Sequence, residues 1–332
     1  MLPSGDDSTA PVAPHRFHSR TNALEVVDGL DLTGQTILVT GTTSGIGIET
    51  ARTLAIKGAH VVMANRNIIQ SEQLRDKIYA EYPEGKAKDN VDLIHMDLSS
   101  LQSVQAAAKE FLSKGWPLNV LILNAGVYSP PTKTTIDGYE TAFGVNHLGH
   151  FYLTYLLLDK LRESAPSRVV VVSSAAHIIT RINQALPTEE KLNKLIPEPS
   201  TNEFTLTLYA YSKLCNALFG LKLHRDESAS GIHTYVLHPG TFISTGLARS
   251  YGAITKIQQF LSKPFVKTLQ QGAATNVYCA VSPDVENDSD HYYESCYNAD
   301  ENLHALAKDE ALQDALWEKS LEFVKKFEDS RV

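Results

Sequence analysis

A tyrosine and a lysine four residues apart are the side chains whose types and spacing most directly suggest chemistry. Tyr209 and Lys213 lie in a stretch, residues 207–224, whose pattern predicts a helix. At this spacing both side chains project from one helix face, with Cβ atoms about 5–6 Å apart. An ammonium about 4 Å from a phenol can lower the pKa of the phenol from about 10 toward neutrality. The pair is therefore a candidate proton donor and acceptor, although the same spacing also occurs in solvated surface pairs.

The bulk properties of the chain narrow the classes of function open to it. It has 332 residues, of which 43% are hydrophobic and 20% charged, so it can bury a large core. Its net charge of −8 disfavours nucleic acid and anionic membrane surfaces as partners. Three widely spaced cysteines without a C-x-x-C motif indicate a reducing compartment. With no signal sequence and no apolar run approaching ~18 residues, we expect a cytoplasmic protein without a transmembrane segment, and peripheral membrane or lipid-droplet association stays open.

From residue 35 onward, short apolar segments alternate with segments of helical periodicity. This alternation predicts an α/β fold of Rossmann type, a doubly wound parallel sheet with helices on both faces. The expected strands cover residues 36–40, 60–64, 91–95, 119–123, 169–172, 234–237 and 291–293, and the expected helices cover residues 48–56, 68–82, 100–113, 146–161, 207–224, 257–265, 271–280 and 309–327.

The alternation runs without a break in composition, which favours one domain. We expect residues 1–20, rich in Pro, Ser and Asp, to be a disordered lead-in to a single domain at 21–332. Segments at about 178–204 and 241–265 are candidate lids, because long connections inside a compact domain are usually functional. The region after residue 240 supplies apolar side chains that either line a substrate pocket or belong to the core: Phe242, Ile243, Leu247, Tyr251, Ile254 and Phe260.

The first expected strand leads into a glycine-rich turn of the kind that holds a pyrophosphate. Gly41, Gly45 and Gly47 follow a buried strand and open a helix, whose N-terminus favours anions. After the second strand the chain reads Asn65-Arg66, where an NAD-binding protein would place an acidic residue. An arginine there can bind a 2′-phosphate through two hydrogen bonds, so we expect NADP(H) rather than NAD(H). A solvated surface arginine is the alternative.

Taken together, five motifs in this order resemble the short-chain dehydrogenase/reductase family, and specifically its retinol-dehydrogenase-like branch. The motifs are Thr40-Gly41-x-x-x-Gly45-x-Gly47, Asn124-Ala125-Gly126, Ser173-Ser174, Tyr209-x-x-x-Lys213 and His238-Pro239-Gly240. The branch is indicated by Asn65-Arg66-Asn67, by residues 145–151 and by residues 212–216. Residues 263–265 and 270–275 are most similar to the oxidoreductase domain of WW-domain-containing members. This sequence carries no WW module, so the resemblance does not imply their peptide-binding partners.

The resemblance implies a role for each matching residue. Tyr209 would be the general acid in reduction and the general base in oxidation, while Lys213 would lower its pKa and bind the nicotinamide ribose. Ser174 would hydrogen-bond the substrate carbonyl oxygen, and Asn146 would anchor a water that relays protons to Lys213. The cofactor would be held by Gly41, Ser44, Gly45, Ile46, Gly47, Asn65, Arg66, Asp97, Leu98, Asn124, Ala125, Gly126, Tyr209, Lys213, Pro239 and Gly240.

These inferences predict an NADP(H)-dependent oxidoreductase that interconverts a hydrophobic alcohol and its carbonyl, such as a retinoid, a steroid or a lipid-derived aldehyde. A catalytically weak cofactor-binding scaffold or sensor is the alternative. The resemblance also implies a homodimer that pairs through the helices following the fourth and fifth strands. His147, His150 and His177 raise the question of a metal, but the sequence offers no clear third ligand, so we expect none.

Overall fold

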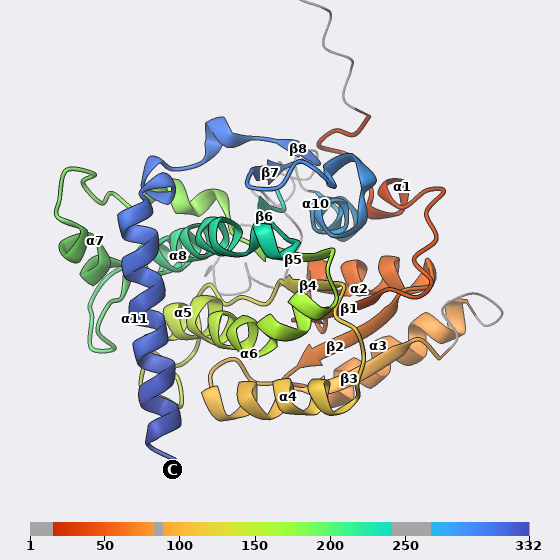
Figure 1. Cartoon of the computed structure of the whole chain (residues 1–332), viewed down its shortest axis with the longest axis horizontal. Helices are drawn as coiled ribbons and strands as arrows, with labels where there is room; N and C mark the ends of the chain where they lie inside the picture. The colour runs from red at the N-terminus through yellow and green to blue at the C-terminus, as the bar shows by residue number, and fades with distance from the viewer. Residues whose placement is uncertain (1–15, 83–88, 241–266, 332) are drawn as a thin grey trace, which may run out of the picture.

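A computed structural model describes residues 16–82, 89–240 and 267–331. Within these residues one sheet has the strand order β3-β2-β1-β4-β5-β6-β7-β8, in which β1 to β7 are parallel and β8 is antiparallel to β7 (Figure 1). This topology confirms the predicted Rossmann-type fold. The strands are β1 (Thr36–Thr40), β2 (His60–Asn65), β3 (Val91–His95), β4 (Val120–Leu123), β5 (Ser167–Val172), β6 (Ile232–His238), β7 (Tyr292–Glu294) and β8 (Tyr297–Asn298).

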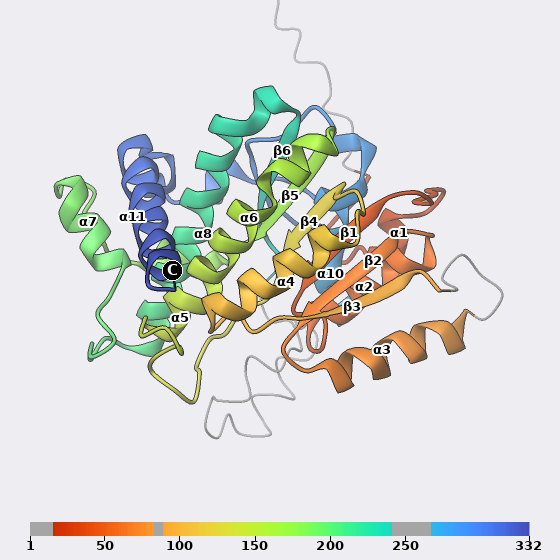
Figure 2. The same ribbon diagram turned by 60° about the horizontal axis from the view of Figure 1, so that its bottom comes forward.

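Helices cover both faces of the sheet (Figures 1 and 2). One face is packed by α2, α3 and α10, and the other by α4, α6 and α8. The helices are α1 (Ala23–Val26), α2 (Ile46–Ile56), α3 (Ile68–Glu81), α4 (Leu101–Ser113), α5 (Thr141–Phe143), α6 (Gly149–Glu163), α7 (Thr188–Leu195), α8 (Thr205–Glu227), α10 (Leu269–Val281) and α11 (Glu310–Asp329), with shorter turns η1 (Gly144–Leu148), η2 (Ala175–Ile179), η3 (Ser228–Ser230), η6 (Pro283–Val285), η7 (Asp300–Asn302) and η8 (Ala305–Lys308).

The central strands are largely apolar because both of their faces are covered. In β1, Leu38 packs into the core beneath α4, α6 and α8, while its neighbours Ile37 and Val39 pack into the core beneath α2 and α10. Successive side chains of a strand point to opposite faces, so a strand buried on both sides must be a continuous hydrophobic run. The central strands β1 and β4 are fully buried along their length for this reason.

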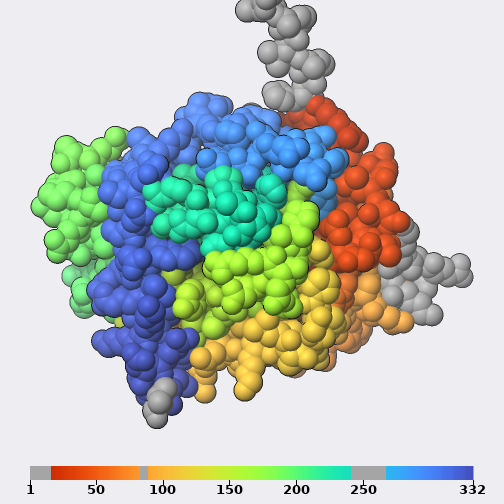
Figure 3. Space-filling model, in the orientation of Figure 1, coloured from red at the N-terminus to blue at the C-terminus, as the bar shows by residue number. Residues whose placement is uncertain are grey.

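The C-terminal helix α11 packs over the outer side of α6 and α8. The Trp317 ring lies 5.0 Å from that of Phe151 in α6 and 6.0 Å from that of Phe219 in α8. Tyr152 Oη donates to Glu328 at 2.8 Å. In Figure 3, α11 (blue) lies against the surfaces of α8 (teal) and α6 (green). These are the helices that follow β5 and β4, so part of the surface expected to form a homodimer is covered by the same chain, and the homodimer stays a prediction.

The structure differs from the sequence prediction in several elements. The helix expected at 146–161 is confirmed as α6 from residue 149 onward, whereas residues 146–148 belong to a π-helical turn, η1. The candidate lid at 178–204 contains α7, which packs against α8 and α11 and is anchored by an ion pair of 2.8 Å between Lys191 and Asp309. The short strand β8 was not predicted. The helix expected at 257–265 and the second candidate lid lie outside the described residues.

Candidate active site

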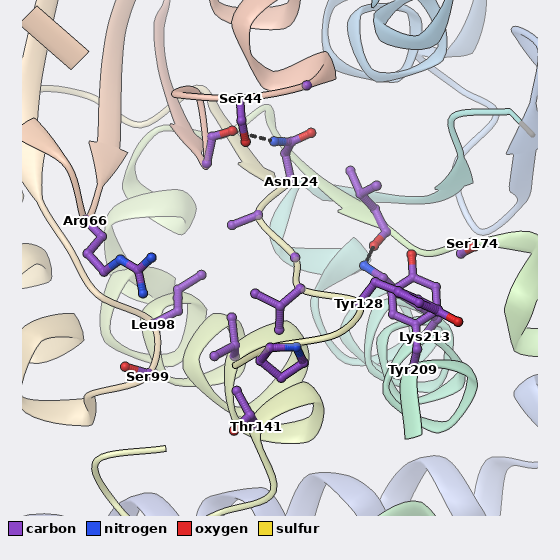
Figure 4. A pocket seen from close by; sticks show the side chains of 18 of the residues that line it. Ser44, Arg66, Leu98, Ser99, Asn124, Tyr128, Thr141, Ser174, Tyr209 and Lys213 are labelled. Carbon is purple, nitrogen blue, oxygen red and sulfur yellow. Dashed lines mark hydrogen bonds between the residues drawn. The ribbon is translucent and has the colours of Figure 1, made fainter. Parts of the chain in front are cut away.

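A cavity of about 1090 Å³ opens at the carboxyl ends of the parallel strands (Figure 4). Ligands of open α/β sheets bind at this edge, where strand order reverses between β1 and β4. The four predicted catalytic residues and most of the predicted cofactor residues lie in or beside its wall. No residue of 178–204 is among the described lining residues, and the lid role of this segment stays a prediction.

Two glycines of the glycine-rich turn after β1, Gly41 and Gly47, are packed so closely that neither position could carry a side chain. A Cβ on Gly47 would lie 2.1 Å from the carbonyl oxygen of Gly41, and one on Gly41 would lie 2.7 Å from Cα of Ala125. Asn124 Nδ2 donates to the carbonyl oxygens of Thr40 and Gly41, at 2.9 and 3.1 Å. The turn is therefore rigid and leads directly into the N-terminus of α2, a geometry that suits a pyrophosphate.

Arg66 follows the last residue of β2 and is exposed at the cavity. Figure 4 shows its guanidinium extending toward the side of the cavity where Leu98 and Ser99 lie. Its predecessor Asn65 is buried and uses its amide elsewhere, accepting from the Thr42 N–H at 2.7 Å and donating to hydroxyls of neighbouring residues. Asn65 thus ties the glycine-rich turn to β2, and a direct cofactor contact from its side chain stays a prediction.

The wall opposite Arg66 is formed by the segment after β3. Asp97 Oδ1 accepts from the N–H and the hydroxyl of Ser99, at 2.9 and 2.8 Å, which fixes the carboxylate at the cavity. Leu98 contributes an apolar surface beside it. At the other end of the cavity, Pro239 and Gly240 follow β6, and Gly240 has a φ of +113° that favours glycine.

Tyr209 and Lys213 project from α8 into the same part of the cavity (Figure 4). Lys213 Nζ lies 5.7 Å from the centre of the Tyr209 ring and donates to the carbonyl oxygen of Val172 at 2.9 Å. The ammonium is buried, and this loss of hydration lowers the pKa of Lys213 to about 7. The Tyr128 ring packs edge-on against that of Tyr209, with centroids 5.2 Å apart.

The two serines after β5 have different environments. Ser173 is buried, and its hydroxyl donates to the Lys213 carbonyl oxygen at 2.7 Å, which holds α8 against β5. Ser174 is partly exposed at the cavity, and its hydroxyl accepts from the Ala176 N–H at 3.2 Å. Since the Ser173 proton is already used, this geometry favours Ser174 as the residue that meets a substrate.

Asn146 lies in the π-helical turn η1, fully buried between Val127 and α8. Its amide accepts from the Val127 N–H at 2.7 Å and donates to the Val127 carbonyl oxygen at 2.9 Å. It also donates to Ser212 Oγ at 2.9 Å, and that hydroxyl donates to the carbonyl oxygen of Tyr209. Asn146 therefore connects η1 to the turn of α8 that carries Tyr209 and Lys213.

Several residues that line the cavity were not predicted from the sequence. Asn67 caps α3 by accepting from the Gln70 N–H, and both side chains border the Arg66 end. Their proximity to Arg66 in the sequence was the available signal. Other unpredicted lining residues include Tyr128, Pro130, Pro131, Ile136, Val145 and Leu206.

The histidines that raised the question of a metal do not cluster with further ligands. Across residues 16–82, 89–240 and 267–331, no three His, Cys, Asp or Glu side chains are placed to hold a metal ion together. His147 and His150 instead bond in opposite directions from one helical segment, to Ser320 and to Thr40.

Comparisons with known proteins agree with this geometry. Residues 35–186 match a family model described as short chain dehydrogenase. The WW domain-containing oxidoreductase of Pongo abelii is 43% identical over 292 residues, which cover 88% of this chain and 69% of that protein. The chain belongs to the short-chain dehydrogenase/reductase family. Retinol dehydrogenase 12 of Mus musculus is 38% identical, covering 89% of this chain and 88% of that protein. The crystal structure of an uncharacterized protein from Mycobacterium Paratuberculosis, 31% identical, has a TM-score of 0.68 and covers 90% of this chain and 97% of that one.

Membership of the short-chain dehydrogenase/reductase family confirms the predicted resemblance. The protein is an oxidoreductase that uses a nicotinamide cofactor and acts on a small-molecule substrate. Among the helices that the structure describes, none is both long and apolar enough to span a membrane.

Proposed function

We propose that this protein is an NADP(H)-dependent oxidoreductase that interconverts a hydrophobic alcohol, of the retinoid, steroid or lipid-derived class, and its carbonyl. The observation that carries the cofactor choice is Arg66 at the end of β2. It is exposed at the cavity, beside the N-terminus of α3, and the position carries no carboxylate. A guanidinium can hold a 2′-phosphate through two charge-assisted hydrogen bonds, whereas a ribose 2′-hydroxyl is bound by an acidic side chain.

The residues around the cavity fit such a cofactor. Gly41, Ser44, Gly45 and Ile46 line the cavity at the start of α2, where a pyrophosphate would bind. Asp97 and Leu98 line the part of the cavity where the adenine would bind, and Gly126, Pro239 and Gly240 line the part where the nicotinamide would bind. When bound, NADPH supplies the hydride that reduces the carbonyl carbon.

The chain's own residues supply the proton and the charge stabilisation. In reduction, Tyr209 Oη donates its proton to the oxygen that becomes the alcohol, while the Ser174 hydroxyl donates a hydrogen bond to that oxygen. Lys213 stabilises the resulting phenolate in its ammonium form, which predominates below its pKa of about 7. In oxidation the same steps run in reverse, with Tyr209 as the base.

An apolar substrate is supported by the walls next to Tyr209. Tyr128, Pro130, Pro131 and Leu206 line this end of the cavity. They can remove the hydrocarbon part of a substrate from water, which is favourable by about 25 cal/mol per Å² of apolar surface buried. The apolar residues predicted between 242 and 260 lie outside the described residues, and their contribution stays a prediction.

Two sets of variants test this proposal. Arg66→Ala should weaken NADPH binding about 10- to 100-fold, as expected for loss of a charge-assisted contact, and should leave NADH binding unchanged. Fluorescence energy transfer from protein to cofactor measures both affinities. Arg75→Ala is the matched control, because Arg75 lies on α3 outside the cavity lining and pairs with Asp76. Equal losses for both cofactors would contradict the assigned role of Arg66.

Turnover is tested with a panel of apolar aldehydes and ketones, by following NADPH absorbance. Tyr209→Phe should lower kcat about 100- to 10,000-fold with a much smaller change in NADPH affinity, because the hydroxyl that transfers the proton is removed and the ring is kept. Tyr211→Phe, the same substitution two residues along α8, should retain activity. Tight NADPH binding without turnover across the panel would instead support the scaffold or sensor alternative.

A further inference from the structure

Two buried histidines that the proposed mechanism does not use contact the main chain of proposed catalytic residues. His150 Nδ1 lies 3.0 Å from the carbonyl oxygen of Asn146, and His177 Nδ1 lies 2.6 Å from the carbonyl oxygen of Ser174. A carbonyl oxygen can only accept, so each contact requires a proton on Nδ1. The second nitrogen of each ring shows whether that requirement is met.

For His150 the second partner is Thr40, the last residue of β1, whose Oγ1 lies 2.9 Å from Nε2. This hydroxyl already accepts from the N–H groups of Asn124 and Ala125, at 3.0 and 2.9 Å. A hydroxyl has two acceptor sites and one proton, so the Thr40 proton is left to point at Nε2. Nε2 therefore accepts, and the proton of the neutral ring is on Nδ1, where it donates to Asn146.

For His177 the second partner is a main-chain donor. The N–H of His304, between η7 and η8, donates to His177 Nε2 at 3.0 Å. Nε2 is again the acceptor, so the ring proton is again on Nδ1 and donates to the Ser174 carbonyl oxygen. The two rings have the same tautomer for independent reasons. For His150 the tautomer is imposed by the Thr40 hydroxyl, whose two acceptor sites are already occupied, and for His177 by the backbone N–H of His304.

We propose that His150 and His177 are positioning residues, each a neutral Nδ1-protonated imidazole that fixes the main-chain carbonyl of Asn146 or Ser174 for the reaction. This inference rests on the proposed function for the roles of those two residues. Both links reach across the fold: His150 connects η1 to the end of β1, and His177 connects the end of β5 to the segment before α11. Each proposed catalytic residue is thereby held relative to a distant element.

The environment keeps both rings uncharged, as the proposal requires. Burial, with a smaller effect of the Lys213 charge, lowers the pKa of His150 to about 3. Burial lowers the pKa of His177 to about 4, and the neighbouring His304 adds to this effect. A second ring proton would be on Nε2 and would point at another donor, the Thr40 hydroxyl for His150 or the His304 N–H for His177. Protonation would therefore break that hydrogen bond.

The first test is spectroscopic and independent of turnover. Two-bond ¹⁵N–¹H correlation spectra of the full chain labelled with ¹⁵N-histidine distinguish a protonated Nδ1 from a protonated Nε2. Assignment follows from the loss of signals in His150 and His177 variants. We expect the Nδ1-protonated pattern for both rings at pH 7. An Nε2-protonated or a charged ring at either position would overturn the proposal for that residue.

The second test uses substitutions to distinguish the contribution of Nδ1 from that of Nε2 in each ring. Asparagine places an amide donor near the position of Nδ1, and glutamine places an amide near the position of Nε2. His150→Gln and His177→Gln should therefore lower kcat about 10- to 100-fold, the scale of an ångström misplacement, with NADPH affinity changed less than about twofold. His150→Asn and His177→Asn should keep kcat within about threefold, although their melting temperatures fall.

His147→Gln is the matched control. His147 lies in η1 next to Asn146, but its Nε2 bonds to Ser320 and no main-chain carbonyl of a proposed catalytic residue depends on it. Its kcat should be unchanged. If an asparagine variant lost as much kcat as its glutamine counterpart, or a glutamine variant kept wild-type kcat, the proposal would be overturned for that histidine. If the wild-type protein turned over no carbonyl, the proposed function would fail on its own, and the tautomers measured by NMR would still decide the hydrogen bonds.

Discussion

Low pH should destabilise this protein because His147 cannot bind a second ring proton in the folded state but can in the unfolded chain. Ser320 Oγ lies 2.9 Å from His147 Nε2 and donates its own proton to the Leu316 carbonyl oxygen, so it accepts from Nε2. His147 Nδ1 is buried and has no hydrogen-bond partner among the residues that the structure describes, in a site lined by the rings of Phe143 and Phe151. A proton added to Nδ1 would be a buried donor without an acceptor. Burial, with a smaller contribution from His150, accordingly lowers the pKa of His147 to about 3.

The size of the effect follows from the two pKa values. Between pH 6.5 and 3 the unfolded chain binds a proton at His147 that the folded chain does not, so the free energy of unfolding falls as pH falls through this window. The slope approaches about 1.4 kcal/mol per pH unit, which amounts to about 2 kcal/mol between pH 7 and pH 5. That is a large part of the 5–15 kcal/mol by which a typical domain is stable.

His147→Gln removes the titrating group and keeps a donor for Ser320. We expect urea unfolding at pH 7, 6 and 5 to show that the wild type loses stability faster than the variant. From pH 7 to pH 5, the free energy of unfolding of the variant should rise by about 2 kcal/mol relative to that of the wild type. His95→Gln is the control, because it makes the same substitution at an exposed side chain at the end of β3. If wild type and His147→Gln lost stability in parallel as the pH fell, the buried, uncharged ring inferred for His147 would be refuted.

Three further substitutions test the geometry around the site. Gly126→Ala would place a methyl 3.4 Å from Lys213 Nζ, so kcat should fall about tenfold while unfolding in urea changes by less than about 0.5 kcal/mol. Gly220→Ala would place Cβ 2.4 Å from Val236 Cγ2 between α8 and β6, and should cost about 1–3 kcal/mol in the same unfolding assay. Leu316→Ala, which empties a buried position of α11, should cost about 2–5 kcal/mol and lower the melting temperature. Unchanged stability of either buried variant would contradict the close contacts described here.

The sequence predicted the central strands well because burial on both faces leaves an unmistakable pattern. The run at residues 36–40 is apolar and β-branched, and it coincides with β1. Two features were out of reach for physical reasons. The π-helical turn η1 differs from an α-helix by one hydrogen-bond step, which leaves no mark on the spacing of apolar residues. The short helix α7 is mostly polar and lies between prolines, so its segment resembled a loop.

The candidate site could be located from the sequence, but the hydrogen-bond partners of its polar residues could not be predicted. Asn65 and Asn124 match cofactor-binding positions by motif, yet their amides hold the glycine-rich turn in place. His150 and His177 lie near matched motifs, and only the second partner of each ring shows which nitrogen carries the proton. Motifs identify which residues come together. Which polar groups hold the backbone in place, and which are left to contact a substrate or cofactor, depends on contacts between distant parts of the chain.

The position of α11 has a consequence for how the protein is made. Ser320 and His147 are 173 residues apart in sequence and in contact in the fold. During synthesis, η1, α6 and α8 leave the ribosome long before the helix that covers them. Until residues 310–329 are available, the aromatic surface of Phe151 and Phe219 faces water, and such surface promotes aggregation and capture by chaperones. A chain interrupted before α11 would contain every motif of an oxidoreductase and still be a substrate for quality control.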